Sequence, residues 1–410
     1  MKYLPLCLLL AVTQIESQTT LDPINQQWLE SFLNTPSPVQ TKQQQWLDTF
    51  LPKPKSLDPT VKSGDCTTKD QLRGRCVKPS ECAVKASDEG IDLTKLGVYR
   101  GLNCHYLLKC CPRKQIITKP ATKPPPMDVA PRVGCGWPMP ALTNYRTTGT
   151  NYASFGEFPW MVALLRKTSE IWEQKDYLGG GSLIHPSVVM TVAHKVSNLS
   201  KNEIKCRAGE WDTQTLDEEH EHQERDVAKI ISHEGLWLKR GYNNIALLIL
   251  QKPFELVGAP HIGIACLGQS MPSEGTKCLS MGWGQTEFKN PDAYAVILKK
   301  VKLPIYNRDQ CQVNLRKYKN FHKWTLHDSM MCAGGEEGVD TCTGDGGSPL
   351  VCEIDGDADS NRYAVYGMVS LGLGCGRKDT PGVYTDVTYV YDWVKKTMKA
   401  EGLPTDSFVY

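Results

Sequence analysis

Sixteen cysteines set the strongest limit on how this 410-residue chain folds. Six of them crowd into the segment from Cys66 to Cys111, which is too short to bury a large apolar core. Disulfides must therefore hold this segment together, and they form in an oxidising compartment. Six cysteines can pair in many ways, so counting them does not give the connectivity.

The amino-terminal residues agree with that compartment. Lys2 precedes a short apolar run from Leu4 to Val12, a pattern typical of a secretory signal over residues 1–17. The run is too short to span a bilayer, and no later segment is long enough. We therefore expect a secreted, extracellular protein without a membrane span.

A polar extension, residues 18–62, follows the signal and contains a duplication. The motif QQWLESFL begins at Gln26 and returns as QQWLDTFL at Gln44. Prolines between and after the copies argue against a folded unit, which favours a disordered extension. The alternative is that the repeated aromatic residues are docking anchors for a partner.

Three further parts complete the chain. Residues 63–112 form the disulfide-rich domain, and residues 113–134 form an extended linker rich in proline and lysine. Residues 135–410 form one large domain, whose short alternating runs at Ser187–Ala193 and Ile245–Leu250 predict antiparallel β-structure. The formal net charge of +2 gives no reason to expect a nucleic-acid partner.

One loop in the large domain carries a protease pattern. Residues 340–352 read DTCTGDGGSPLVC, which resembles the GDSGGPL nucleophile loop of chymotrypsin-like serine proteases. The alignment places Gly346 where the family has its catalytic serine. Ser348 lies two residues further on, and this shift is incompatible with the geometry that an attacking hydroxyl needs.

Two other blocks support the same resemblance. Ser182–Lys195 resembles the block that ends in the catalytic histidine, which assigns that position to His194. Tyr242–Leu250 resembles the block with the orienting aspartate, where this chain has Asn244. In an active enzyme, that aspartate-to-asparagine change lowers turnover about 10⁴-fold. We therefore interpret His194 as a retained structural histidine. We expect the protein to have no functional catalytic residues and no enzymatic activity.

The resemblance also implies a fold. Chymotrypsin-like proteins have two six-stranded antiparallel barrels and a C-terminal helix, here expected around Val390–Lys399. The spacing of the first six cysteines, which ends in an adjacent pair, resembles the clip domain of arthropod proteases. The two resemblances imply seven disulfides: Cys66–Cys110, Cys76–Cys104, Cys82–Cys111, Cys135–Cys266, Cys278–Cys352, Cys311–Cys332 and Cys342–Cys375.

Cys206 is left without a partner in this scheme. The family's bridge beside the histidine would need cysteines at Gly179 and Lys195, and both are absent. An odd cysteine in a secreted protein is either paired between molecules or free. A buried thiol in an expected strand at 204–208 is an equally good interpretation.

The residues of the substrate specificity pocket are better preserved than the catalytic ones. Asp340 matches the aspartate with which trypsin-like members bind arginine or lysine, and Gly372 and Gly382 match the residues that keep the pocket open. Leu371 replaces the usual tryptophan of the pocket wall. The pocket either holds a basic side chain without cutting beside it or is a relic, and we favour the relic.

Proteolytic processing is also predicted. Arg146–Thr147 lies where family zymogens are cut, and the new amino terminus of active members pairs with the carboxylate matched here by Asp345. Thr147 replaces the usual isoleucine, so its insertion would bury less apolar surface. Cleavage after Arg146 or in the linker is therefore expected to expose a binding surface instead of an active site.

Two minor features remain. Asn198 begins a sequon for one N-linked glycan. Glu210 and Asp217 match carboxylates that bind calcium in some relatives, but His220 lies near the position of another ligand. We therefore expect a solvated acidic loop, with neither a metal nor another cofactor.

Together the motifs resemble the clip-domain serine protease homologues of arthropod haemolymph. The resemblance implies a non-catalytic cofactor or regulator of an innate-immune cascade that activates prophenoloxidase and leads to melanisation. Expected partners are cascade serine proteases and prophenoloxidase, with other clip-domain homologues or microbial surfaces as further candidates. A recognition module for microbial or matrix surfaces is the alternative, and an active peptidase with an unusual mechanism is a third, disfavoured interpretation.

Overall fold

The computed structural model describes eleven stretches of the chain: residues 65–67, 72–77, 82–83, 109–116, 134–138, 151–167, 176–214, 218, 220–285, 294–354 and 361–410. The chain divides into two units, Met1–Pro52 and Lys53–Tyr410, and every described residue belongs to the second. The predictions for the signal, the duplicated segment, Cys104, Arg146–Thr147 and Asp217 lie outside the described residues.

The cysteine-rich segment contains a small antiparallel sheet in the order β1-β2-β3. Cys66 is bonded to Cys110, and Cys82 to Cys111. Cys76 is also in a disulfide. The apolar cluster here is small and includes two of the bonded cysteines, so the bridges do much of the stabilising. The elements are β1 (Asp65–Thr67), β2 (Arg73–Val77), β3 (Lys109–Pro112) and the 3-10 turn η3 (Arg113–Gln115).

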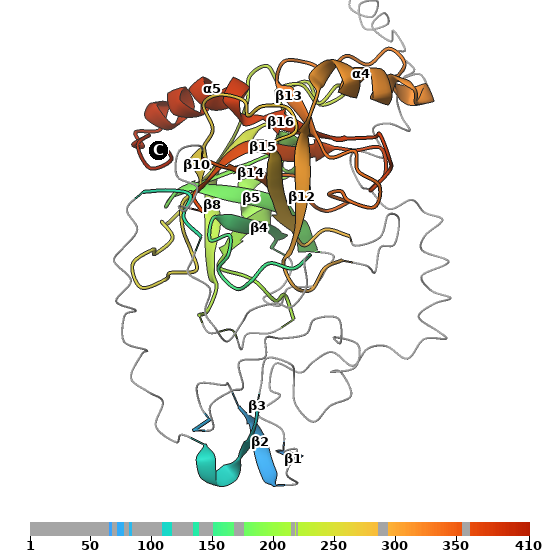
Figure 1. Cartoon of the computed structure of the whole chain (residues 1–410). Helices are drawn as coiled ribbons and strands as arrows, with labels where there is room; N and C mark the ends of the chain where they lie inside the picture. The colour runs from blue at the N-terminus through green and yellow to red at the C-terminus, as the bar shows by residue number, and fades with distance from the viewer. Residues whose placement is uncertain are drawn as a thin grey trace, which may run out of the picture. The chain divides into compact units, whose positions relative to one another are not determined.

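Two barrels make up the large domain (Figure 1). The first is closed in the order β4-β5-β6-β9-β8-β7, and all its pairings are antiparallel. Its buried strands explain the alternating and continuous apolar runs of the sequence. The strands are β4 (Met161–Arg166), β5 (Tyr177–His185), β6 (Val188–Thr191), β7 (Ile204–Ala208), β8 (Gln223–Ser232) and β9 (Ala246–Leu250).

The second barrel follows the order β14-β11-β12-β13-β16-β15, and the pairing of β15 with β14 closes it. A short strand, β10, adds in parallel to β15. The two expected six-stranded antiparallel barrels are thus confirmed. The strands are β10 (Cys266–Leu267), β11 (Lys277–Gly282), β12 (Lys299–Tyr306), β13 (Met330–Ala333), β14 (Pro349–Glu353), β15 (Tyr363–Leu371) and β16 (Gly382–Asp386).

Four disulfides stabilise the second barrel and the segments that flank its strands. The structure pairs Cys135 with Cys266, Cys278 with Cys352, Cys311 with Cys332, and Cys342 with Cys375. These are the pairs that the resemblance implies. Cys206 is free and buried in β7.

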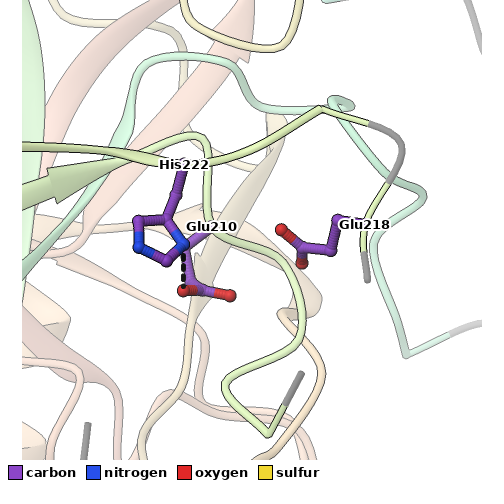
Figure 2. Close-up of side chains that lie close together, drawn as sticks. All are labelled: Glu210, Glu218 and His222. Atoms are coloured by element: carbon purple, nitrogen blue, oxygen red, sulfur yellow. Dashed lines mark ion pairs between the residues drawn. The ribbon is translucent and has the colours of Figure 1, made fainter. Parts of the chain in front are cut away.

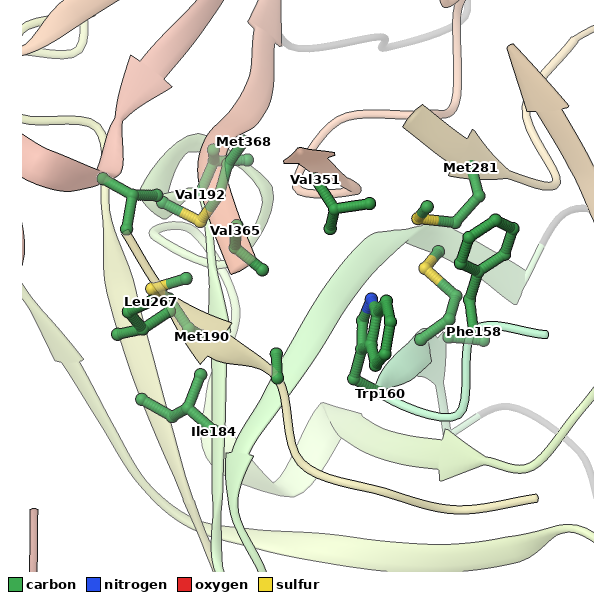
Figure 3. Close-up of a cluster of buried hydrophobic side chains, with 14 of the residues drawn as sticks. Phe158, Trp160, Ile184, Met190, Val192, Leu267, Met281, Val351, Val365 and Met368 are labelled. Carbon is green, nitrogen blue, oxygen red and sulfur yellow. The ribbon is translucent and has the colours of Figure 1, made fainter. Parts of the chain in front are cut away.

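A shared apolar core joins the barrels (Figure 3). Trp160 and Met190 come from the first half of the large domain, and Met281, Val351 and Met368 come from the second. Because all five are buried in one cluster, the two barrels are packed against each other around a common interior.

The C-terminal helix α5 spans Val387–Ala400 and lies beside β10 and β15 (Figure 1). It begins earlier than expected because the Asp386 carboxylate accepts hydrogen bonds from the backbone N–H groups of Thr388 and Tyr389. A second helix, α4 (Arg308–Arg316), was not expected; the Asn307 side chain caps it. None of the helices in the described ranges is long and apolar enough to cross a membrane.

Candidate functional site

His194 lies in the 3-10 turn η6 (Ala193–Lys195) and contacts Asn244, which is buried just before β9. The backbone N–H of His194 donates to Asn244 Oδ1 at 2.9 Å, which fixes the orientation of the amide. Asn244 Nδ2 then lies 2.8 Å from His194 Nδ1 and also donates to Ser370 Oγ at 2.9 Å. Two positions predicted from the sequence, His194 and Asn244, are thus brought into contact.

This contact determines the imidazole tautomer. Asn244 Nδ2 can only donate, so His194 Nδ1 must accept, and the ring proton therefore resides on Nε2. The pKa of His194 is lowered to about 3, mainly by burial and also by the neighbouring Lys195 charge, while the Asn244 hydrogen bond opposes the shift. A neutral imidazole with a proton on Nε2 offers the cleft a donor, whereas a general base must offer an acceptor.

Lys195 occupies the space where a catalytic side chain would project. A Cβ added to Gly346 would lie 2.5 Å from Lys195 Cε, 3.3 Å from His194 Nε2 and 3.5 Å from Lys195 Nζ. The Lys195 side chain also passes Gly179, where an added Cβ would lie 3.3 Å from Lys195 Cε. The missing histidine bridge thus leaves room for a basic side chain.

Ser348 is not positioned as a substitute nucleophile. It is fully buried, and Cβ atoms added to Gly180 or Gly282 would contact its hydroxyl oxygen. The hydroxyl thus lies in the packed interior between strands.

The loop backbone retains features of an anion-binding turn. Gly344 and Gly347 have φ angles of 99° and 88°, values that favour glycine. Within the described part of the chain, the N–H groups of Gly344 and Gly346 donate no hydrogen bond. Backbone amides at these two positions are where the family forms its oxyanion hole.

Asp340 lies at the base of the expected specificity pocket. Its Oδ1 accepts from the Thr341 N–H at 2.8 Å, and its Oδ2 accepts from the Gly376 N–H at 3.1 Å. Burial raises the pKa of Asp340 to about 7, against these two hydrogen bonds. No ion pair to Asp340 forms among the described residues.

Gly382 lies next to Asp340. A Cβ on Gly382 would lie 3.2 Å from Tyr384 Cε2 and 3.4 Å from Asp340 Oδ1. Gly372 is exposed, and Leu371 is buried at the end of β15. The cavity that borders Asp340 is lined by neither of the two glycines nor by Leu371.

Asp345 borders a cavity of about 240 Å³, which is also lined by Asp340 and Lys299. Its Oδ1 accepts from the Gly284 N–H and its Oδ2 from the Cys342 N–H, each at 2.9 Å. Burial raises the pKa of Asp345, and these two donors oppose the rise. The carboxylate is thus anchored by the backbone next to open space.

The acidic loop differs from the expectation. Glu210 and Glu218 are 6% and 2% exposed, so the prediction of a solvated loop is wrong for these residues. Arg207 of β7 donates to Glu210 Oε2 at 2.8 Å, while Glu218 Oε1 accepts from the backbone N–H groups of Trp211 and Asp212. Burial requires partners of this kind, since an uncompensated carboxylate would be costly.

Glu210, Glu218 and His222 bring ligand atoms within 4.8 Å of one another. Burial raises the pKa of Glu210 to about 7, with Arg207 opposing, and burial raises that of Glu218. His222 Nδ1 lies 3.4 Å from Glu210 Oε2 (Figure 2). Because the Arg207 guanidinium already contacts Glu210, these residues do not fit a calcium ion.

The remaining predicted sites are simple to place. Cys206 is fully buried in β7, and burial raises the pKa of its thiol, so it is poorly suited to react. Asn198 is exposed, as a glycan acceptor must be. The functional residue that sequence reasoning missed is Lys195, which was considered only as a lost cysteine, although it directly follows His194.

Comparison with known proteins places this geometry in a family. The trypsin family model matches residues 147–394. Phenoloxidase-activating factor 2 of Galleria mellonella is 43% identical over 301 residues, which cover 71% of this chain and 97% of that protein. Two relatives named Inactive CLIP domain-containing serine protease are each 36% identical: one from Anopheles gambiae, covering 73% of this chain and 78% of the relative, and one from Aedes aegypti, covering 64% and 54%. The chain belongs to the trypsin family, as a clip-domain serine protease homologue.

Proposed function

We propose that this chain is secreted and acts as a non-catalytic cofactor in the extracellular protease cascade that activates prophenoloxidase. The observation that carries the proposal is the position of Lys195 Cε, which takes the space of a side chain at Gly346 beside His194. The relative named phenoloxidase-activating factor supports the choice of cascade.

The catalytic positions support the absence of peptidase activity. Gly346 has no hydroxyl to attack a carbonyl, and Asn244 holds His194 in a tautomer that cannot accept a proton at Nε2. The names of the inactive relatives agree with this interpretation. The protein would therefore act by binding, with cascade serine proteases and prophenoloxidase as its partners.

Processing after Arg146 is part of the proposal. The family match begins at residue 147, which supports the assignment of Thr147 as a new amino terminus. Asp345 borders a cavity, so a carboxylate is available to receive that terminus. Cleavage would reorganise the surface around the cavity without creating an enzyme.

The experiment is a prophenoloxidase activation assay with full-length protein, before and after cleavage by a trypsin-like protease. Arg146→Ala is the test variant, and Arg132→Ala is its matched control in the linker. Hydrolysis of an arginine amide is measured in parallel. We expect a cleavage-dependent change in phenoloxidase output that only Arg146→Ala prevents, with no amide hydrolysis.

Other results would change the assignment. No effect on phenoloxidase, combined with direct binding to bacteria or polysaccharide, would favour a surface-recognition module. Amide hydrolysis that His194→Ala abolishes would overturn the non-catalytic role altogether.

A further inference from the structure

Lys195 is a primary amine whose chemistry the proposed function does not use. It follows His194 in η6, and a Cβ on Gly346 would lie 2.5 Å from its Cε and 3.5 Å from its Nζ. Gly179 borders the same side chain, since a Cβ there would lie 3.3 Å from Lys195 Cε. An amine therefore stands beside the position from which the family's serine hydroxyl projects.

The Lys195 amine is not committed to an ion pair. No carboxylate lies within 4.0 Å of its Nζ in the described part of the chain. Asp345 is the acidic group that acts on its charge, and both Asp345 oxygens accept backbone hydrogen bonds, from Gly284 and Cys342. Lys195 is also partly exposed, so a small molecule can reach its nitrogen from solvent.

Burial of most of the side chain favours the uncharged amine. It lowers the pKa of Lys195 to about 8, with Asp345 opposing the shift. About a tenth of such an amine is uncharged at pH 7, against fewer than about one in a thousand for an unperturbed lysine. Desolvation of this kind activates lysines that attack carbonyl compounds, because only the uncharged amine has a lone pair to donate.

The nucleophile loop supplies groups that stabilise the product of such an attack. An amine that adds to a carbonyl moves an electron pair onto the oxygen, which then needs hydrogen-bond donors. Within the described part of the chain, the N–H groups of Gly344 and Gly346 donate no hydrogen bond. His194 Nε2, which carries the ring proton, lies 3.3 Å from the position of the Cβ on Gly346. A nucleophile and donors thus meet at one residue.

We propose that Lys195 is a nucleophilic amine that forms an imine with an aldehyde at the former catalytic centre. The Nζ lone pair bonds to the carbonyl carbon, and the π pair of the carbonyl becomes an oxyanion held by the loop amides. The two amine protons pass through solvent to this oxygen, the C–O bond breaks, and water leaves as the C=N bond forms. One amine and one aldehyde give one imine and one water, without an oxidant or reductant. The inference goes beyond the proposed function and does not depend on it.

An aldehyde suits the centre better than a peptide bond does. Cleavage of a peptide bond requires a general acid that protonates the departing nitrogen. His194 is neutral, with a pKa of about 3, so it is not such an acid. An aldehyde releases only water, and the nitrogen lone pair drives that departure. The features that prevent proteolysis therefore permit imine formation.

The test is reductive trapping of the full-length protein with benzaldehyde and cyanoborohydride at neutral pH, followed by peptide mass spectrometry. Cyanoborohydride reduces the imine and leaves a benzyl group on each amine that has reacted. We expect Lys195 to be labelled at least about tenfold faster than the exposed Lys201 of the same molecule, because far more of Lys195 is uncharged at this pH.

Gly346→Ala separates the effect of the site from that of the lysine alone. Its Cβ would meet Lys195 Cε, so Nζ must move away from the loop amides, and labelling of Lys195 should fall toward that of Lys201. Thermal unfolding confirms that the variant is folded. Gly258→Ala is the matched control: it strains a backbone with positive φ but meets no atom within 4 Å, and it should keep the preference for Lys195.

Two results would overturn the proposal. Equal labelling of Lys195 and Lys201 in the wild-type protein would exclude an activated amine without the need for any variant. A preference for Lys195 that survives in folded Gly346→Ala would remove the role of the former catalytic centre. Because the trapping contains no cascade component, its failure leaves the prophenoloxidase assay free to succeed or fail separately.

Discussion

The catalytic centre and the specificity pocket of this protein have diverged by different amounts. At the catalytic centre, Gly346 and Asn244 replace reactive groups, and Lys195 fills the vacated space. In the pocket, Asp340 keeps its carboxylate, which accepts backbone hydrogen bonds, and the matching positions Gly372 and Gly382 remain small. The difference indicates that the reactive groups were replaced while the charged residue of the pocket was kept.

The largest expected effect tests whether Lys195 blocks the catalytic centre. Gly346→Ser alone should remain inactive toward an arginine amide, because the new Cβ meets Lys195 Cε. Combining it with Asn244→Asp and Lys195→Ala, in protein cleaved after Arg146, should raise the rate at least about 10³-fold, since the aspartate alone contributes about 10⁴ in active enzymes. Initial-rate assays measure this gain.

The control for this gain is His194→Ala in the triple variant, which should abolish it. If Gly346→Ser alone were as active as the triple variant, Lys195 would not obstruct the catalytic centre. The catalytic centre would then differ from the specificity pocket less than we infer.

A second prediction concerns the pocket. Benzamidine should bind the wild-type protein, and Asp340→Asn should weaken it by about 30-fold or more, because the loss of one charge from a buried pair costs about 2–5 kcal/mol. Fluorescence or calorimetric titration measures the affinity. Asp392→Asn, at an exposed residue of α5, is the matched control and should leave binding unchanged. Failure of the wild-type protein to bind would make the pocket a relic.

A smaller, pH-dependent effect on ligand affinity distinguishes the specificity pocket from the catalytic centre. Burial raises the pKa of Asp340 to about 7, with Asp345 adding to the rise, so its negative charge appears only as the pH increases through 7. Burial lowers the pKa of Lys195 to about 8, with Asp345 opposing, so its positive charge disappears above 8. Neutral His194 contributes no charge across this range.

Affinity for benzamidine should therefore rise as the pH increases through about 7, because its cation pairs with the ionised Asp340 carboxylate. Loss of the Lys195 charge above about pH 8 should not reverse this rise. A flat profile between about pH 6 and 8 would contradict the assignment of the Asp340 charge.

The smallest expected effect is at the acidic loop, where a basic side chain contacts a candidate calcium ligand. Arg207 contacts Glu210, so millimolar calcium should not shift the unfolding temperature, whereas a ligand at 100 times its Kd would add about 2.7 kcal/mol. Differential scanning fluorimetry with calcium, and with magnesium as the control, measures this. A calcium-specific increase would place a cation in the loop despite Arg207.

The sequence was sufficient to predict the barrels, because strand patterns, aligned motifs and cysteine positions all agreed. It was also sufficient to show that Gly346 stands at the position of the family's catalytic serine. It did not predict that Lys195 fills this position, because that depends on two bare glycines, Gly179 and Gly346, meeting across the fold. The sequence likewise did not predict the burial of Glu210. Glu210 follows β7, whose Arg207 pairs with it, and β7 lies between β4 and β8, which come from separate parts of the chain.

The Cys135–Cys266 disulfide has a consequence for how a processed molecule would behave. A cut after Arg146 divides the backbone, but this bond keeps the clip segment attached to the barrels. A partner held by one part would then meet the other part at an effective concentration of about millimolar instead of by free diffusion. Two weak contacts could thus act as one strong contact, and reduction of the cut protein under denaturing conditions would release the two parts as separate chains.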